Sequence, residues 1–294
     1  MSLSAGALSR ECRAALSRAF MRHSPDSVLD ARGYMADPRQ NLVEGVSFAD
    51  IEGDILQGDG SELRGDGRGR PPKFLAAHSS TALAVNVFGP GKTKPQALRL
   101  PWGGPFTGLR FERKCPHGVG NGKPPNLDVL LDGPGGVIGI ESKCLEAIGD
   151  HKAEFRPAYD ADVRGARRET PWFREIARLT ADAGAYRRLN AAQLLKHALG
   201  LAFSFPDRST TLAYVFWEPS NAAEHPLFSE HRAELNRFAA AVAGGGPDFV
   251  WMSYPDLWTW WDGLQDAPDW LGPHVMRLRE RCDVIVDRPI RSRP

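Results

Sequence analysis

NLDVLLDGPGGVIGIESK, residues 126–143, is the stretch that decides the fold. Its first half, NLDVLLD (126–132), is a short apolar-rich run, and its second half begins another run, VIGIESKCLE (137–146). The turn-forming residues Gly-Pro-Gly-Gly (133–136) separate the two. Two runs of strand length around a tight turn predict an antiparallel β-hairpin.

The polar residues of this hairpin are expected to meet on one face of the sheet. Side chains alternate between the two faces of a strand, so Glu141 and Lys143 share a face. If the strands pair through the turn, Asp128 faces the same side. The residues expected on the opposite face of the first strand are Leu127, Val129 and Leu131. Two carboxylates and one ammonium group then converge beside an apolar sheet.

This set of groups is suited to metal-assisted hydrolysis of a phosphodiester. Carboxylates beside an apolar sheet are costly unless they are paired or bind a metal ion. Mg²⁺, with Mn²⁺ as a substitute, is bound by one or two carboxylates plus water and phosphate oxygens. The ion lowers the pKa of a bound water and neutralises developing charge. Lys143 is then in place to orient or deprotonate the water, or to stabilise that charge.

The residues on both sides of the turn resemble the PD-(D/E)xK nuclease superfamily, in particular its restriction-endonuclease-like members. Residues 125–128, Pro-Asn-Leu-Asp, stand where the family has its first acid, and 141–143, Glu-Ser-Lys, match the (D/E)xK half. The resemblance covers about residues 78–220. It implies an α/β fold with a restriction-endonuclease-like core, in which helices flank a central mixed sheet.

The resemblance also implies a role for each site residue. Asp128 and Glu141 would bind the metal ion with the carbonyl group of Ser142, and Lys143 would be the catalytic lysine. Because Asp128 follows the proline by three residues rather than directly, Asp132 competes for the role of first acid. Further candidates are an acid on the preceding strand and polar residues on the following helix, namely Glu112, Gln193 and Lys196.

The rest of the chain supplies the elements that such a core needs. We expect a helix or strand over 78–89 and a strand over 109–114, both before the hairpin. The elements expected after it are helices around 171–181 and 184–203, a strand over 211–219 and a helix over 224–243. The predicted division is an N-terminal helical and loop extension (1–75), the nuclease-like core (76–245) and a Trp-rich C-terminal extension packed on the core (246–294).

Composition limits the class of protein and the compartment. The 37 Lys+Arg residues nearly balance 36 Asp+Glu residues, which excludes a globally basic nucleic-acid coat. No apolar stretch is long enough to span a membrane, and the four scattered cysteines favour a reducing compartment, so we expect the cytoplasm. Local basic residues flank the predicted strands and are candidates to follow phosphates. They are Arg64, Arg68, Arg70, Lys73, Lys92, Lys94, Arg99, Arg110, Arg113, Lys114 and Lys123.

The sequence therefore predicts a Mg²⁺-dependent endonuclease that hydrolyses DNA phosphodiester bonds, restriction-like in kind. One alternative is a catalytically inactive nuclease fold used for DNA binding or assembly. Another is a structural α/β domain in which the acids and the lysine form an ion-pair network. The sequence leaves open whether the substrate is DNA or RNA, whether it is single- or double-stranded, and whether the protein is a homodimer.

Overall fold

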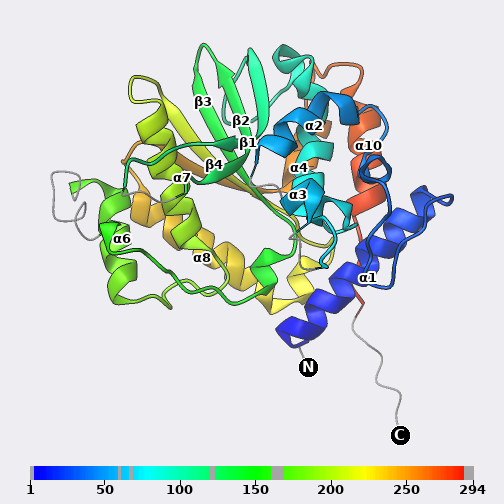
Figure 1. Ribbon diagram of the computed structural model, residues 1–294, viewed down its shortest axis with the longest axis horizontal. Coiled ribbons are helices and arrows are strands. Elements are labelled where there is room, and N and C mark those ends of the chain that lie inside the picture. Colours follow the sequence, from blue (N-terminus) through cyan, green and yellow to red (C-terminus); the bar gives the residue numbers. More distant parts are fainter. Residues whose placement is uncertain (1–2, 59–60, 66–68, 120–122, 160–168, 288–294) are drawn as a thin grey trace, which may run out of the picture.

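A five-stranded mixed sheet forms the centre of the protein (Figure 1). The computed structural model describes residues 3–58, 61–65, 69–119, 123–159 and 169–287. The strands lie in the order β1-β2-β3-β4-β5, with β1 to β3 antiparallel and β4 and β5 parallel to β3. Their bounds are β1 Gly108–Lys114, β2 Asn126–Gly133, β3 Gly136–Lys143, β4 Thr210–Phe216 and β5 Asp248–Ser253.

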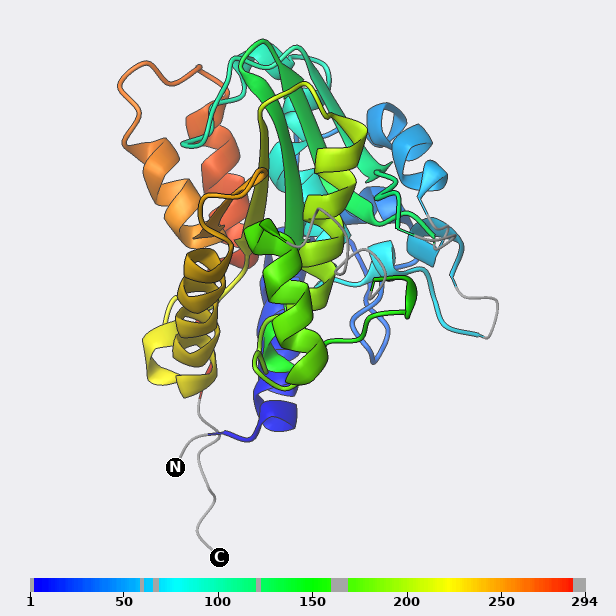
Figure 2. The ribbon, with the colours of Figure 1, turned by 90° about the vertical axis from the view of Figure 1, so that its left-hand side faces the viewer.

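Helices cover both faces of the sheet, each over its own apolar core. On one face lie α1 (Ala5–His23), α2 (Phe48–Gln57), α4 (Ser80–Phe88), α9 (Tyr254–Asp262) and α10 (Leu271–Cys282). On the other lie α6 (Pro171–Ala181), α7 (Ala191–Ser204) and α8 (Pro226–Val242). Figure 2 shows α9 and α10 side by side at one flank and α7 along the strands. This arrangement confirms the predicted α/β class with a central mixed sheet flanked by helices.

Short helical segments complete the described chain. They are α3 (Ser61–Arg64) and the 3-10 turns η1 (Pro38–Asn41), η2 (Lys73–Leu75), η3 (Gly89–Lys92), η4 (Pro95–Ala97), η5 (Glu146–Ile148) and η7 (Ala222–Glu224). No helix in the described ranges combines the length and the apolar character needed to cross a membrane.

The predicted elements are present, with shifted ends. The helix expected at 171–181 has these bounds, and the Thr170 hydroxyl accepts the Phe173 N–H at its start. The helix expected from 184 begins only at Ala191, because the Asn190 side chain caps it by accepting the Gln193 N–H. The segment expected at 78–89 as helix or strand is a helix.

The sheet continues beyond the predicted core. β5 pairs in parallel with β4, so residues after 245 supply an edge strand of the same sheet. α1 likewise packs into the core that contains α9 and α10. The division of the chain at residues 75 and 245 stays a prediction about folding units, while the packing on this face is continuous across both points.

The hairpin has the register that the sequence predicts. β2 and β3 pair from Val129 opposite Ile140 to Gly133 opposite Gly136. Gly136 has a φ of 138°, and a Cβ there would lie 2.6 Å from the Ser209 carbonyl oxygen. This turn therefore requires glycine for both its backbone conformation and its close approach to the chain before β4.

Candidate active site

A cavity of about 500 Å³ opens where β2 and β3 stop pairing. The five polar side chains predicted for the catalytic site all line it: Glu112, Asp128, Glu141, Lys143 and Gln193. They come from β1, β2, β3 and α7, four elements that the fold brings to one place. The other polar side chains of the lining include Tyr34, Glu62, Lys73, His78, Asn126 and Glu146.

A break in the β1–β2 pairing shapes the floor of the cavity. Glu112 has a φ of 51°, a left-handed conformation that non-glycine residues rarely adopt outside turns. Phe111 pairs with Val129 and Arg113 with Leu127, but the pair between them, Glu112 with Asp128, is missing. Backbone strain of this kind is often found at functional sites.

The break also corrects one prediction. Strict alternation places Leu127, Val129 and Leu131 on one face of the sheet. In the structure Val129 and Leu131 pack in the core with α4, whereas Leu127 packs in the opposite core with α7. Because the pairing is interrupted at Asp128, the side chains before and after this residue do not follow one continuous alternation between the two faces of the sheet.

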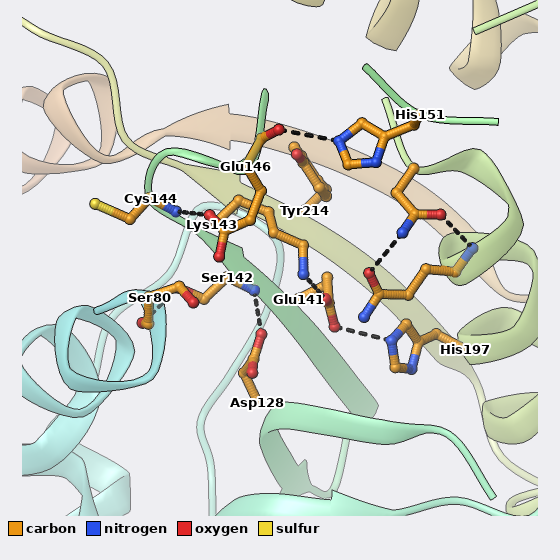
Figure 3. Close-up of polar contacts among 12 residues, drawn as sticks. Ser80, Asp128, Glu141, Ser142, Lys143, Cys144, Glu146, His151, His197 and Tyr214 are labelled. Carbon is orange, nitrogen blue, oxygen red and sulfur yellow. Dashed lines mark hydrogen bonds and ion pairs between the residues drawn. The ribbon is translucent and has the colours of Figure 1, made fainter. Parts of the chain in front are cut away.

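Asp128 uses its carboxylate to satisfy the backbone of the neighbouring strand. Its Oδ2 accepts the Ser142 N–H at 2.6 Å, a contact visible in Figure 3. In an extended strand the N–H and C=O of one residue point to the same side, so the Ser142 carbonyl is also directed toward β2. Burial and the charge of Glu141 raise the pKa of Asp128 well above its usual range. The two carboxylates therefore repel each other across the cavity.

Glu141 lies between a lysine and a histidine. Lys143 Nζ donates to its Oε1, and His197 Nε2 lies 2.9 Å from its Oε2, although the direction of that contact is poor for a hydrogen bond (Figure 3). Burial raises the pKa of Glu141, but Lys143 and His197 outweigh this and lower it to about 2. Burial alone lowers the pKa of Lys143, but the surrounding acids, Glu141 first, raise it above its ordinary value. The pair is therefore a carboxylate and an ammonium ion at neutral pH.

Glu112 is a buried acid that, unlike Glu141, is uncharged at neutral pH. Asn126 Nδ2 donates to its Oε2, and the side chain is 7% exposed. Burial, then the charges of Glu62 and Glu141, raise the pKa of Glu112 to about 8. It holds a proton at neutral pH, so the cavity carries less negative charge than its number of carboxyl groups suggests.

Two rival candidates lie away from the cavity. Asp132 is near the hairpin turn, half exposed, and its Oδ1 accepts from Arg208 Nη2 at 3.0 Å. Lys196 donates to the Glu154 carbonyl at 3.0 Å and lies over the Phe155 ring. The structure thus places Asp128 rather than Asp132, and Gln193 rather than Lys196, beside Glu141.

His197 is the site residue that sequence reasoning missed. It is one helical turn after Gln193 on α7, so both side chains project from the same face. That spacing was a signal in the sequence, but a histidine in an apolar helix is as common in a core as in a site. Glu146 was also missed; its carboxylate accepts the Cys144 N–H just after β3.

The basic residues expected to follow phosphates are used in several ways. Lys92 pairs with Asp54, Arg99 Nη1 donates to the Gln96 carbonyl at 2.8 Å, and Lys73 pairs with Glu62 beside the cavity. Arg110 and Arg113 are exposed on β1. Arg68 lies outside the described residues.

The oxygen donors of the cavity fit a hard divalent cation. Asp128 and Glu141 come from adjacent strands, and burial, followed by the charge of Glu141, raises the pKa of Asp128, so a cation beside both carboxylates would stabilise their charged forms. In the part of the chain that the structure describes, no three His, Cys, Asp or Glu side chains are grouped as a ready metal site. Mg²⁺ does not need such a group, because one or two carboxylates suffice when water and phosphate complete its shell.

Comparison with known families agrees with this geometry. Residues 54–281 match the family described as Restriction Endonuclease associating with ARP. The match spans more than half of the chain and contains all five strands. No curated protein and no solved structure gives a significant match. The chain therefore belongs to this restriction-endonuclease-like family, which confirms the resemblance carried by its β-hairpin.

Proposed function

We propose that the protein is a Mg²⁺-dependent endonuclease that hydrolyses DNA phosphodiester bonds in the β2–β3 cavity. One observation carries the proposal: Asp128, Glu141 and Lys143, from two adjacent strands, line one polar cavity. Membership of a restriction-endonuclease-like family supports the same reaction and makes DNA the expected substrate. A cytoplasmic location stays a prediction from the sequence, and the sequence leaves a homodimer as an open alternative.

Asp128, Glu141 and the Ser142 carbonyl are the groups that would hold the metal ion. When bound, a divalent ion lowers the pKa of water and neutralises charge on the phosphate. The protein's part is to hold these ligands in place. The sheet fixes Ser142, and His197 lies against the Glu141 carboxylate from the side of α7.

Lys143 supplies a fixed positive charge in the cavity. Its ammonium group lies against Glu141, and its side chain is 13% exposed. A buried ammonium ion stabilises negative charge that develops on a phosphate more strongly than one in water, because the local dielectric constant is lower. Since Lys143 is protonated in this arrangement, we favour this role over that of general base. Gln193 adds a neutral amide, which can orient a water or a phosphate oxygen.

The neutral state of Glu112 helps a polyanion to enter. With Glu112 protonated, and with Glu141 and Glu62 paired with Lys143 and Lys73, the cavity carries less unbalanced negative charge against an approaching phosphate. A cavity lined by three free carboxylates would repel it. The charge state of the site therefore suits a phosphodiester, which is itself an anion.

The experiment is cleavage of supercoiled plasmid DNA with Mg²⁺ or with EDTA. Wild-type protein should nick or linearise the plasmid only with Mg²⁺, and Lys143→Ala should lower the rate about a hundredfold or more. Lys196→Ala is the matched control, because it removes a lysine that lies outside the cavity. Cleavage by Lys143→Ala at the wild-type rate would remove Lys143 from the mechanism.

A second candidate function is assembly without cleavage. The description of the family names an association with ARP, which favours a role in a complex. Salt-sensitive DNA binding by the wild type, with no cleavage in Mg²⁺ or Mn²⁺, would select this inactive form of the nuclease fold.

A further inference from the structure

A basic groove runs along the outward face of α1, apart from the cavity described above. It has a volume of about 910 Å³, and its floor is formed by small and apolar side chains of α1: Ala14, Ser17 and Met21. Residues 29–34 and 70–71 form its opposite wall. Figure 1 shows α1 below α3, on the side of the molecule that carries α10.

The helical spacing of α1 places arginines on both rims of this floor. Arginines occur at positions 10, 13, 18 and 22, while the floor residues occur at 14, 17 and 21, along one stripe of the helix. All four arginines are exposed, and within the described residues none of them forms a salt bridge. No acidic residue of α1 lies three or four positions from any of them, so the helix itself does not offset their charge.

The groove has a strong excess of positive charge. Among the described residues that line it are six arginines and a single acid. The arginines are Arg10, Arg13, Arg18, Arg22, Arg32 and Arg70. The acid, Asp30, is already engaged: it pairs with Arg32 at 3.2 Å and accepts the backbone N–H groups of Arg32 and Tyr34. The groove therefore has the charge of a site for a polyanion.

The groove adjoins the candidate active site. Tyr34 lines both the groove and the β2–β3 cavity. The segment that carries Tyr34 is fixed, because Met35 N–H donates to the Leu75 carbonyl and Ala77 N–H to the Gly33 carbonyl, each at 2.9 Å. Gly33 lies so close to α1 that a Cβ would be 2.8 Å from Ser17 Oγ. The junction between groove and cavity is thus already formed in the free protein.

We propose that this groove binds the phosphate backbone of the DNA strand whose cleaved bond occupies the cavity. The inference rests on the proposed nuclease function and names the surface that holds its substrate. Arginines on the two rims contact phosphates, and the apolar floor packs against sugars. An acidic peptide would also match the charge, but a continuous polyanion also accounts for the groove and the proposed catalytic cavity sharing Tyr34 in their linings.

Most of the groove is formed by residues that precede the part of the chain matching the family. The family match begins at residue 54, whereas α1 and the segment with Arg32 and Tyr34 precede it. Under this proposal the segment before residue 54 contributes to substrate binding.

The test is DNA binding by fluorescence anisotropy in EDTA, with a labelled 30-base-pair duplex and the matching single strand, from 50 to 200 mM KCl. The variant Arg13→Ala/Arg18→Ala should bind at least tenfold more weakly. Its log–log salt slope should be less steep by about two, since each lost phosphate contact removes about 0.9. The control Arg174→Ala/Arg237→Ala removes two exposed arginines from α6 and α8, on the other side of the sheet, and should bind as the wild type does.

The outcomes separate the groove from the proposed function. If the wild-type protein binds DNA and the groove variant binds it with the same affinity and salt slope, the groove proposal alone is overturned. Wild-type protein that binds neither DNA probe would overturn the proposed function, and the groove with it. Equal losses in the groove variant and the control would show a general charge effect and would also overturn the groove. Comparison of the two probes tells whether it holds duplex or single strand.

Discussion

Replacing Glu112 by glutamine should stabilise the protein, and the gain should grow with pH. Burial, with the charges of Glu62 and Glu141, raises the pKa of Glu112 from 4.5 to about 8. Between about pH 4.5 and pH 8 the folded protein therefore holds a proton on Glu112 that the unfolded chain releases. Stability contributed by this proton is present below about pH 4.5 and is lost as the pH rises toward 8.

The size of the effect follows from the pKa difference. One pKa unit corresponds to about 1.4 kcal/mol, so keeping Glu112 protonated in the folded state at pH 7, where the unfolded chain releases this proton, costs about 3 kcal/mol of stability. Between pH 6 and pH 8 the cost grows by about 2 kcal/mol. A glutamine carries no charge, and its amide oxygen can still accept from Asn126. Most of the pH-dependent cost should therefore disappear in the variant.

Urea unfolding in EDTA at pH 6 and pH 8 measures this difference. Glu112→Gln should be more stable than wild type at both values, with the larger gain at pH 8. The control Glu52→Gln removes an exposed acid from α2 and should change stability little at either pH. A gain that is equal at both pH values, or a loss of stability at both, would refute the argument. If the variant is more stable but cleaves DNA more slowly, Glu112 is a functional group that the protein keeps at a cost in stability.

Four further predictions concern the site and its support. Asp128→Asn should abolish Mg²⁺-dependent plasmid cleavage and Asp132→Asn should leave it unchanged; the opposite result would exchange their roles. His197→Ala should weaken the apparent Mg²⁺ affinity in a cleavage titration about tenfold to a hundredfold, because Glu141 loses the ring beside its Oε2. Burial lowers the pKa of His231 to about 3, so the contribution of His231 to stability should fall by about 1.4 kcal/mol per unit as the pH drops below about 6.5. Unfolding curves at pH 6 and pH 4 should show a smaller fall in His231→Gln. Gly136→Ala should lose about 1–3 kcal/mol in urea unfolding, since a Cβ would meet the Ser209 carbonyl.

The sequence was sufficient to predict the hairpin and the grouping of its polar residues. The glycine-rich turn sets the β2–β3 register from Gly133 opposite Gly136 to Val129 opposite Ile140, and Asp128 and Glu141 are the next residues on the two strands. It was not sufficient to choose between Gln193 and Lys196. These residues lie three apart on one helix, and which of them faces the sheet depends on the rotation of α7, which long-range packing decides.

Glu112 shows a second limit of sequence reasoning. The acid was predicted from its place on the strand before the hairpin, but its left-handed backbone was not, because nothing in LRFERK favours a positive φ there. The surrounding structure imposes that conformation. For the same reason the strand alternation failed at Leu127, next to the point where the pairing is interrupted.

The candidate site lies where the backbone pairing of β2 with its two neighbouring strands is interrupted. β1 and β2 skip the Glu112–Asp128 pair, and the pairing of β2 with β3 ends at Val129 and Ile140. The Ser142 N–H then lacks a backbone partner on β2, and the Asp128 carboxylate replaces that partner. A buried N–H without an acceptor is costly, so Asp128 has a structural role in addition to its proposed chemical one. Its second oxygen is the one that would bind the proposed metal ion. Asparagine keeps one acceptor oxygen for Ser142 and removes the charge, so it separates the two roles in a way that alanine cannot.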